Sequence, residues 1–475
     1  MEKFTVIIPT KDRCETLAHT LESCLAVQDA HFEILVSDNH SVDATPEVLA
    51  AFKARDARVR CIRPPHSMGM SLHYEFALDH VTEGFVLILG SDDALLPGAV
   101  TRARAALQNH PDAEVLHGVA CMYFYPDFYS DDAGLIYARI TPCDEVRNSR
   151  EWLLRAMASE CGAADLPMPY QMTWVRNPVF DRLKQKTGRR LHSCFPDYFL
   201  AVAVAAVTEE FVHVSPGFGV SGISSKSIGL SSSYPKASRS AENSFLSENE
   251  IPVHPKVNHT RSLFVVLGET LLRAQEAGLL PEGATIAWDR MVSRACVQFF
   301  SEPWDEAQRR ENIAVMRTIA ANFGCAQALD GMGDTPESVR AWAAQLPYLH
   351  DWHLDEWEAV LDGRLIGVHG VHEAARMIEA MIETSLPATR GLNAARATEE
   401  EFLAWGILEQ AKQAATLRRQ LRDVNRESER RAAERDRAKQ QLTTVREKNE
   451  KLRAKATDGG GTTSKKWIPK WLRGR

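Results

Sequence analysis

The sequence predicts an α/β domain with a mostly parallel sheet, followed by an α-helical domain and a long C-terminal helix. Three observations support this prediction. Residues 4–98 alternate short β-rich runs with longer helical patterns, residues 260–395 contain one helical pattern after another, and a 4-3 apolar spacing begins at Leu417. Strands that alternate with helices are typical of parallel sheets, because each parallel connection needs a crossover.

The first elements follow from hydrophobic periodicity. Phe4–Ile8 is a run of β-formers, and the helix expected over residues 15–27 places Leu17, Leu21 and Cys24 on one face. Further strands are expected over residues 32–36, 59–62 and 85–89, and further helices over 45–54 and about 71–80. We assign residues 1–225 to this α/β domain.

The rest of the chain divides by composition. Residues 226–259 are rich in Ser, Gly and Pro and predict a loop or lid. Helices are expected over residues 262–276, 286–300, 306–322, 339–345 and 373–383, within a helical domain of residues 260–395. Residues 396–457 predict a long charged helix that forms an oligomeric coiled coil or, alternatively, stays solvated, because only the two ends of its heptad pattern are apolar.

Composition and charge narrow the class of protein. Hydrophobic residues make up 44% of the 475 residues, which supports a buried core, and the nine cysteines never form a CxxC pair. The longest apolar run, 199–207, is far below the ~20 residues of a membrane helix. Without a recognisable secretory signal, the chain is expected to be cytoplasmic, with no transmembrane span.

The C-terminal region is basic, whereas the body is acidic. Residues 411–475 contain 20 Lys or Arg against 8 Asp or Glu, although the whole chain has a net charge of −7. The last segment, 458–475, interleaves tryptophan with basic residues, as interfacial membrane anchors do, so we expect peripheral contact with an anionic inner membrane; an unstructured basic tail is the alternative. Nucleic acid is not expected as a partner, because no base-reading motif is present.

Acidic residues follow two predicted strands at the sheet edge where ligands of α/β proteins bind. Asp38 and Asp43 come after the second strand, and Asp92 and Asp93 come directly after the 85–89 strand. Carboxylates beside a phosphate-bearing ligand suit Mg²⁺ or Mn²⁺, which neutralise the charge that develops on a diphosphate leaving group. The alternative is that Asp92 and Asp93 only end a strand and cap the next helix.

Three segments in order carry a family resemblance. Val6-Ile-Ile-Pro-Thr-Lys-Asp-Arg13, Val36-Ser-Asp-Asn-His-Ser-Val-Asp-Ala-Thr45 and Leu89-Gly-Ser-Asp-Asp-Ala-Leu-Leu-Pro-Gly98 resemble the family 2 glycosyltransferases of the GT-A fold. The resemblance covers roughly residues 1–225. It implies an inverting, metal-dependent transfer from a UDP-, dTDP- or GDP-sugar to a glycan or lipid-linked glycan acceptor, as in bacterial surface polysaccharide assembly.

The resemblance also implies roles for individual residues. Asp38 corresponds to the acid that contacts the base, and Ser91-Asp92 to the end of the DxD metal motif. Gly90 occupies the first position of that motif, so Asp92 is expected to carry more of the metal contact, with Asp93 supporting. The residues expected at the nucleotide are Pro9, Thr10, Asp12, Asp38, Asp43, Ser91 and Lys226.

Two segments depart from the family pattern. His66-Ser-Met-Gly69 lies where relatives often have Asn-x-Gly, and Tyr74-Glu75 lies where many carry Arg-Asn. Sugar contacts are therefore not carried over to these positions.

The general base and the diphosphate loop are expected later in the chain. Asp197 begins an apolar helix in Cys194-Phe-Pro-Asp197, where similar segments of the family carry the base; alternatively it only complements the helix dipole. Lys226 follows a Ser- and Gly-rich run and would place a point charge on phosphate, unless this run is merely a flexible loop.

Two other functions compete with glycosyl transfer. A degenerate transferase domain that scaffolds an assembly complex is favoured by Gly90 and by the missing Asn near Gly69. A sugar nucleotidyltransferase would need a glycine-rich triphosphate loop after the first strand, and Pro9-Thr-Lys-Asp-Arg13 contains no glycine.

Overall fold

The computed structural model describes residues 1–227, 229, 245–258, 261–302, 304–349 and 357–385. The chain divides into two compact units, Met1–Gln420 and Leu421–Arg475. The predicted coiled coil (396–457) and basic tail (458–475) lie outside the described residues, as does half of the predicted lid. In the part of the chain that is described, no helix is both long and apolar enough to cross a membrane.

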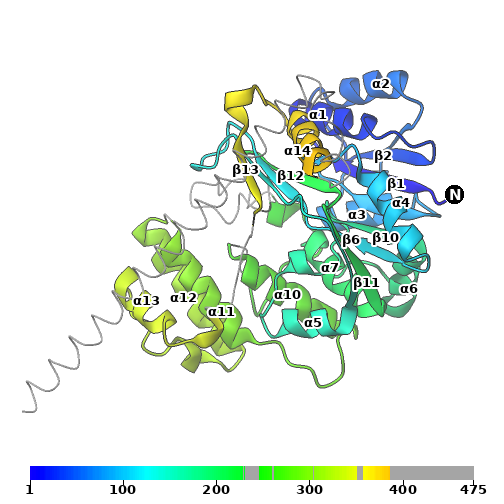
Figure 1. Ribbon diagram of the computed structural model, residues 1–475. Coiled ribbons are helices and arrows are strands. Elements are labelled where there is room, and N and C mark those ends of the chain that lie inside the picture. The colour runs from blue at the N-terminus through cyan, green and yellow to red at the C-terminus, as the bar shows by residue number, and fades with distance from the viewer. Residues whose placement is uncertain (228, 230–244, 259–260, 303, 350–356, 386–475) are drawn as a thin grey trace, which may run out of the picture. The chain divides into compact units, whose positions relative to one another are not determined.

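An eight-stranded sheet forms the centre of the first unit (Figure 1). Its order is β3-β2-β1-β4-β10-β6-β11-β9, and only β10 and β9 run antiparallel to their neighbours. The strands are β1 (Phe4–Thr10), β2 (Phe32–Asp38), β3 (Val59–Ile62), β4 (Phe85–Ile88), β6 (Val115–His117), β9 (Cys143–Asn148), β10 (Thr173–Arg176) and β11 (Glu210–Ser215). The predicted parallel-rich α/β fold is confirmed, with the first strands close to their predicted positions.

Helices cover both faces of this sheet because successive strand side chains point to opposite faces. In β1, Val6 and Ile8 join one buried cluster and Ile7 joins the other. The first face packs on α1 (Cys14–Leu25), α2 (Thr45–Arg55) and α4 (Ala99–Asn109). The second face packs on α3 (Met70–Leu78), α5 (Ser149–Met157), α6 (Asn177–Thr187), α7 (Pro196–Val207) and α10 (Leu263–Glu276).

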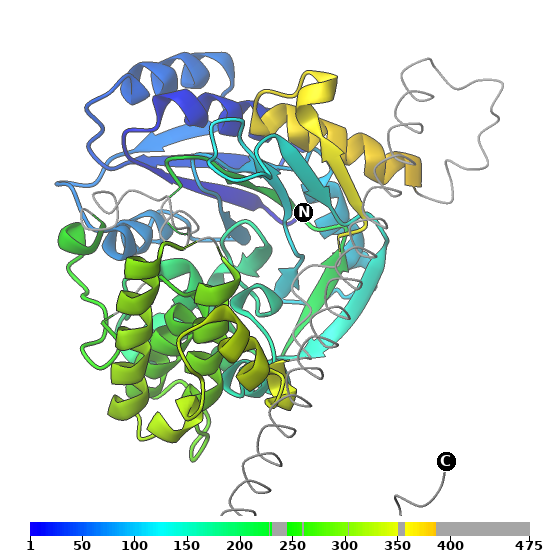
Figure 2. The same cartoon turned by 90° about the vertical axis from the view of Figure 1, so that its left-hand side faces the viewer.

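A second, five-stranded sheet has the order β13-β8-β7-β12-β5. Its strands are β5 (Ala94–Leu95), β7 (Cys121–Phe124), β8 (Leu135–Ala138), β12 (Gly219–Ile223) and β13 (Ala359–Asp362). Beside it, α14 (Val371–Ser385) packs against α1, β5 and β12, and Figure 2 shows the yellow helix next to the dark blue one.

The strand β13 and the helix α14 differ from the predicted domain division. Both lie inside residues 260–395, for which the sequence predicts a separate helical domain, yet they complete the core of the N-terminal domain. A buried ion pair fixes α14 there: Glu379 accepts hydrogen bonds from Arg102 Nη1 at 2.6 Å and from Gly98 N–H at 3.1 Å. An amphipathic pattern predicts a helix but does not identify the core that its apolar face covers.

The helical region proper is smaller than predicted. Trp288, Phe299, Trp304 and Met316 lie in its core. Its helices are α11 (Trp288–Ser301), α12 (Glu306–Asn322) and α13 (Pro336–Ala343), with short 3₁₀ turns at Ala326–Leu329 and Pro347–Leu349. Because α10 contacts both α7 and α11, it joins this bundle to the sheet domain.

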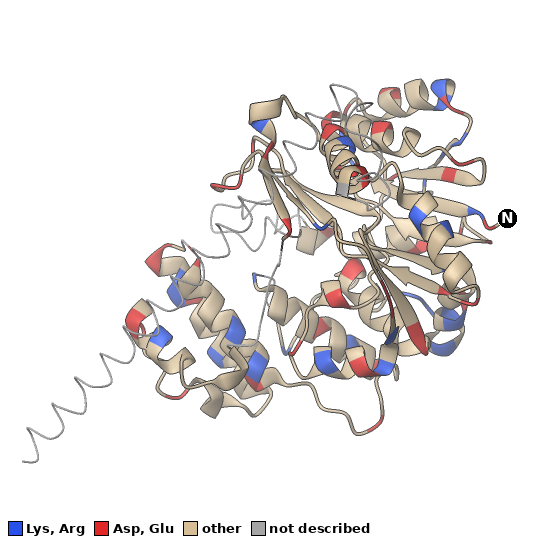
Figure 3. Cartoon of the chain, viewed as in Figure 1, with Lys and Arg blue, Asp and Glu red and all other residues tan. Residues whose placement is uncertain are grey.

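Local sequence signals set several element boundaries. Asn148 caps α5 by accepting from Glu151 N–H, and α6 ends at Gly188, whose φ of 82° is left-handed. The strands β1, β4, β7, β8 and β12 contain no charged residue, and Figure 3 shows charge mainly on the helices. Charge is therefore kept away from most buried strands, so the acids at strand ends stand out.

Candidate active site

The loops after β1 and β2 are joined by Asp12 and Asp43. Asp12 has a φ of 52°, and its Oδ1 accepts a hydrogen bond from Val42 N–H at 2.7 Å. Asp43 accepts from the N–H groups of Cys14 at 3.0 Å and Thr45 at 2.9 Å, the first residues of α1 and α2. Burial acts to raise the pKa of Asp43, but the hydrogen bonds from Thr45 and Cys14 outweigh it and hold the pKa well below its usual range. Both carboxylates shape the turn.

Thr10 and Asp38 are register partners at the carboxyl ends of β1 and β2. Asp38 is buried; its Oδ1 accepts from Ser41 N–H at 3.0 Å and its Oδ2 lies 3.8 Å from Arg63 Nε. The buried hydroxyl of Thr10 has no hydrogen-bond partner among the described residues, and half-buried Pro9 precedes it. A buried hydroxyl without a partner is unusual, and here it lies at the edge of the sheet where ligands bind.

Asp92 follows β4 and is enclosed by a loop from much later in the chain. Its Oδ2 accepts hydrogen bonds from the hydroxyls of Ser224, at 3.1 Å, and Ser227. Burial raises the pKa of Asp92, while the two serines and the charge of Arg13 oppose the rise. Ser91, just before it, is also buried. The carboxylate of Asp92 is therefore surrounded by hydroxyl oxygens and lies near one cation.

Asp93 fills the space that a side chain at position 90 would occupy. A Cβ on Gly90 would lie 2.4 Å from Asp93 Oδ2 and 2.3 Å from the hydroxyl oxygen of Tyr170. Asp93 Oδ2 accepts from Gly90 N–H at 2.9 Å, and Oδ1 accepts from Gly222 N–H at 2.8 Å. Burial and then the charge of Asp92 raise the pKa of Asp93. Both oxygens of Asp93 are thus engaged within the fold.

Lys226 lies at the exposed rim of the loop that covers Asp92. Its Nζ pairs with Glu15 at 2.6 Å, and its carbonyl oxygen accepts from Arg13 Nη2 at 3.0 Å. The Lys226 and Glu15 side chains are 50% and 73% exposed, so their ion pair contributes little stability and exchanges easily for another anion. Arg13, which the sequence did not single out, is the basic group closer to Asp92.

Asp197 lies in the first turn of α7, as predicted from the sequence. Burial raises its pKa, although hydrogen bonds from the backbone at Tyr198 and Asp197 oppose the rise. The pKa of buried Tyr74 on α3 is raised by burial and then by the charges of Asp197, Asp93 and Asp92. The charges of Asp197, Asp92 and Asp93 therefore all act on Tyr74.

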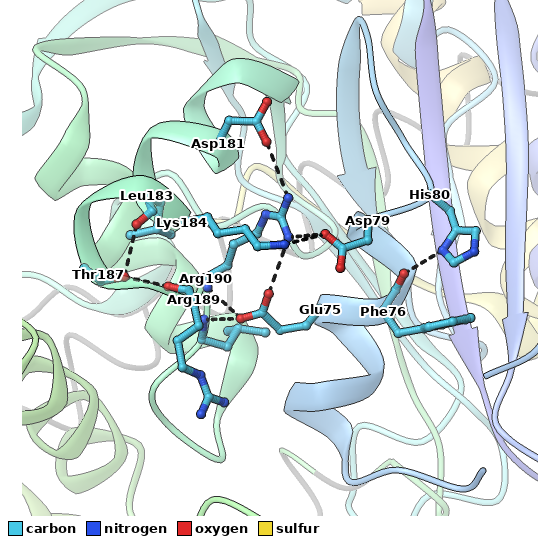
Figure 4. Close-up of polar contacts among 11 residues, drawn as sticks. Glu75, Phe76, Asp79, His80, Asp181, Leu183, Lys184, Thr187, Arg189 and Arg190 are labelled. Carbon is cyan, nitrogen blue, oxygen red and sulfur yellow. Dashed lines mark hydrogen bonds and ion pairs between the residues drawn. The ribbon is translucent and has the colours of Figure 1, made fainter. Parts of the chain in front are cut away.

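The neighbouring Glu75 has a structural role. Its Oε1 accepts from the backbone N–H of Arg190 at 2.6 Å and of Leu191 at 2.8 Å (Figure 4). The Arg190 side chain is only 5% exposed and also pairs with Asp79 at 2.7 Å and with Asp181 at 3.4 Å. Glu75 thus holds the segment that leads to α7.

An acidic segment within the predicted lid (226–259) contacts the sheet domain. Glu248 pairs with Lys11 Nζ at 2.9 Å, and both carboxylate oxygens of Glu250 accept from Gly69 N–H at 3.1 Å. A Cβ on Gly69 would lie 2.5 Å from Glu250, so the close approach requires glycine here. The protein's own carboxylates therefore lie on a lysine and on the N-terminus of α3, groups that favour anions.

These contacts gather most of the predicted site residues around the carboxyl ends of neighbouring strands. Its acids come from the ends of β1, β2 and β4 and from the start of α7, with Arg13 and Lys11 as cations. Among the described residues, no three His, Cys, Asp or Glu side chains are grouped so that they could hold a metal alone. The sequence reasoning missed Arg13, Tyr170 and Gln171; the last two contact Asp93.

Comparison with known proteins supports the family resemblance predicted from the sequence. Residues 5–144 match the family model described as "Glycosyl transferase family 2". It is 31% identical over 102 residues to GalNAc(5)-diNAcBac-PP-undecaprenol beta-1,3-glucosyltransferase of Campylobacter jejuni, covering 21% of this chain and 33% of the relative. It is 29% identical over 98 residues to the succinoglycan biosynthesis protein ExoO of Rhizobium meliloti, covering 21% and 28%.

The chain thus spans about a third of the length of the curated relatives that it matches. Among solved structures, S. aureus TarS 1-349 in complex with UDP-GlcNAc aligns over 80% of this chain and 91% of its own, with 15% identity and a TM-score of 0.39.

Proposed function

We propose that this protein transfers a sugar, with inversion, from a nucleoside-diphosphate sugar to a hydroxyl group of a glycan or lipid-linked glycan acceptor. The observation that carries the proposal is the arrangement of Asp38 and Asp92 after β2 and β4, the two neighbours of β1, with Asp197 and Asp92 both acting on buried Tyr74, in a chain whose residues 5–144 match glycosyltransferase family 2. The described relatives act in glycan assembly by their names, which supports an acceptor of this class.

The residues fit a divalent cation that is shared with the donor. Mg²⁺ or Mn²⁺ prefers oxygen ligands and is commonly held by one or two carboxylates together with phosphate oxygens. Asp92, with the hydroxyls of Ser224 and Ser227, offers such oxygens, whereas Asp93 has both oxygens committed to backbone N–H groups. Asp92 would therefore hold the ion and Asp93 would shape the loop. When bound, the cation neutralises charge on the leaving diphosphate.

The remaining predicted residues divide into two groups. Thr10, Pro9 and Asp38 would contact the nucleoside, with Ser91 beside them, while Asp12 and Asp43 hold the turn that presents these groups. Arg13 and Lys226 would receive the diphosphate, since Lys226 can leave its exposed partner Glu15.

Asp197 would take the proton from the acceptor hydroxyl as the oxygen attacks the anomeric carbon. A carboxylate with a raised pKa is the stronger base near neutral pH, and burial raises the pKa of Asp197. Its place at the helix N-terminus opposes this effect, so burial is the property that suits Asp197 to the role.

Membrane and oligomer contacts rest on the sequence of the C-terminal region. The basic, tryptophan-containing segment 458–475 would hold the enzyme on an anionic inner membrane, close to a lipid-linked acceptor. Liposome flotation of the full chain and of a chain without this segment tests the anchor, and binding that ignores anionic lipid would contradict it.

Isothermal calorimetry of UDP, GDP, dTDP and CDP, with and without Mn²⁺, tests the donor site. One nucleotide should bind in a cation-dependent way, and Asp92→Asn should abolish the dependence on the cation. Asp112→Asn, at an exposed position, is the matched control and should bind like the unchanged protein. The nucleotide that binds identifies the sugar donors to assay for transfer.

Failure of all four nucleotides to bind would favour a scaffold function. A scaffold would also leave sugar nucleotides intact in the presence of acceptor lipids, whereas the enzyme releases a nucleoside diphosphate.

A further inference from the structure

A chain of buried polar contacts links α10 to the start of α7 and to α3. Glu269 on α10 is fully buried, and its Oε2 accepts a hydrogen bond from Ser193 Oγ at 2.6 Å. The same hydroxyl accepts from Phe195 N–H at 3.2 Å, and the Ser193 carbonyl accepts from Ser71 Oγ at 2.6 Å. Ser71 and Ser193 are also buried, so water does not replace these bonds.

These polar contacts reach two parts of the candidate active site, the start of α7 and the start of α3. Phe195 is the residue that immediately precedes α7, so fixing its N–H fixes the first turn, which carries Asp197. Ser71 is in the first turn of α3. Gly69, just before this helix, lies on the side of the site where we propose that the sugar donor binds. Ser193 therefore sets the position of the proposed base relative to the donor side of the site.

The carboxylate of Glu269 has further donors around it. Its Oε1 accepts from His254 N–H and from Arg273 Nε, both at 3.1 Å. With donors on both oxygens, the carboxylate accepts in every direction; an amide would set its NH₂ group against the His254 and Arg273 donors, or would reverse the Ser193 hydroxyl, which no longer donates to position 269. Because both oxygens of this buried carboxylate accept hydrogen bonds, Glu269 stabilises one arrangement of the segments around Ser193, His254 and Arg273.

We propose that Glu269 is a positioning residue for glycosyl transfer, acting through Ser193 to hold Asp197 in register with the donor site. The inference rests on the proposed function. It assigns a role in the reaction to α10, which lies outside the matched family segment of residues 5–144.

The test uses three variants: Glu269→Gln, Ser193→Ala and the double variant that combines these two substitutions. Thr270→Val is the control. Thr270 is equally buried on the same helix, but its hydroxyl donates only within the helix, to the carbonyl of Leu267 at 2.9 Å.

Glu269→Gln and Ser193→Ala should each lower kcat by about 10-fold or more, because small displacements of a catalytic group reduce turnover strongly. The KM for the donor and the Kd for the nucleotide should stay within about 2-fold. The double variant should be no slower than the slower single variant, because both remove the same link.

Hydrogen–deuterium exchange gives a readout that does not depend on turnover. The backbone amides of residues 193–195 and 197–199 should exchange faster in Glu269→Gln and Ser193→Ala than in Thr270→Val. Three results would overturn the positioning role while leaving the transferase in place. The first is unchanged exchange in the two single variants, the second is a loss of kcat in Thr270→Val as large as in those variants, and the third is additive losses of kcat in the double variant. Absence of transfer by the unchanged protein would instead overturn the proposed function, and the inference with it.

Discussion

The family resemblance predicts an acid of a metal motif at position 90, where this chain has Gly90, and the structure predicts that a side chain cannot be added there. A Cβ at position 90 would lie 2.3 Å from the Tyr170 hydroxyl and 2.4 Å from Asp93 Oδ2. Neither group can simply move aside, because Asp93 is buried and accepts hydrogen bonds from Gly90 N–H and Gly222 N–H.

The size of the effect follows from two contributions. Overpacking of a filled core costs about 1–3 kcal/mol. Displacing the Asp93 carboxylate weakens a charge-assisted hydrogen bond, for a further cost of about 1.5–3 kcal/mol. Gly90→Ala should therefore lose about 2.5–6 kcal/mol. With an unfolding entropy of about 2.1 cal/mol/K per residue, a cooperative unit of about 350 residues would melt roughly 3–8 °C lower.

Differential scanning calorimetry of matched glycine variants measures this loss. Gly188→Ala is the control, because its φ of 82° gives backbone strain but no atom lies within 4 Å of the added Cβ. That variant should lose only about 1–2 kcal/mol. Gly90→Asp should melt at least as low as Gly90→Ala and should not strengthen Mn²⁺-dependent nucleotide binding. If Gly90→Ala melts with the unchanged protein, or if Gly90→Asp binds Mn²⁺ and nucleotide more tightly, the reasoning is refuted.

Three further predictions concern the base, the α14 contact and acid stability. Asp197→Asn should lower kcat by about 10²–10⁴-fold while nucleotide affinity stays unchanged in calorimetry, and normal turnover would exclude Asp197 as the base. Arg102→Ala leaves the buried Glu379 carboxylate without its main partner and should lower the unfolding free energy by about 3–5 kcal/mol in urea titrations, whereas a loss below 1 kcal/mol would contradict a buried pair. Burial, with the charges of Arg147 and Arg139, lowers the pKa of His213 to about 3, so the unfolded chain takes up a proton below pH 6.5 that the folded chain refuses. His213→Gln should therefore remove about 2 kcal/mol of the stability change between pH 7 and pH 5, and an unchanged pH dependence would argue against a neutral buried imidazole.

The sequence predicted the N-terminal fold well because its signals are local. The strands Phe4–Thr10 and Phe32–Asp38 are continuous β-forming runs, and α12 has the predicted bounds Glu306–Asn322. Periodicity and capping residues report on neighbours in the sequence, which is sufficient to predict such elements.

The contacts that complete the site are non-local and were not predictable in this way. Ser224 and Ser227 reach Asp92 from the end of β12, and Asp93 occupies the space over Gly90 only because of the turn between them. The two-residue strand Ala94–Leu95 has no periodicity to detect. The sequence therefore identified the acids at the sheet edge, but it could not separate those facing a ligand from those holding loops.

The packing of α14 on α1 also sets a time order for synthesis on the ribosome. The helix that closes the first face of the central sheet is synthesised only after the whole α10–α13 bundle. At 5–20 residues per second, the interval between completion of β12 and of α14 is roughly 10 to 30 s. During that interval the nascent chain exposes the apolar surface that α14 later covers, so it is then a natural client for chaperones.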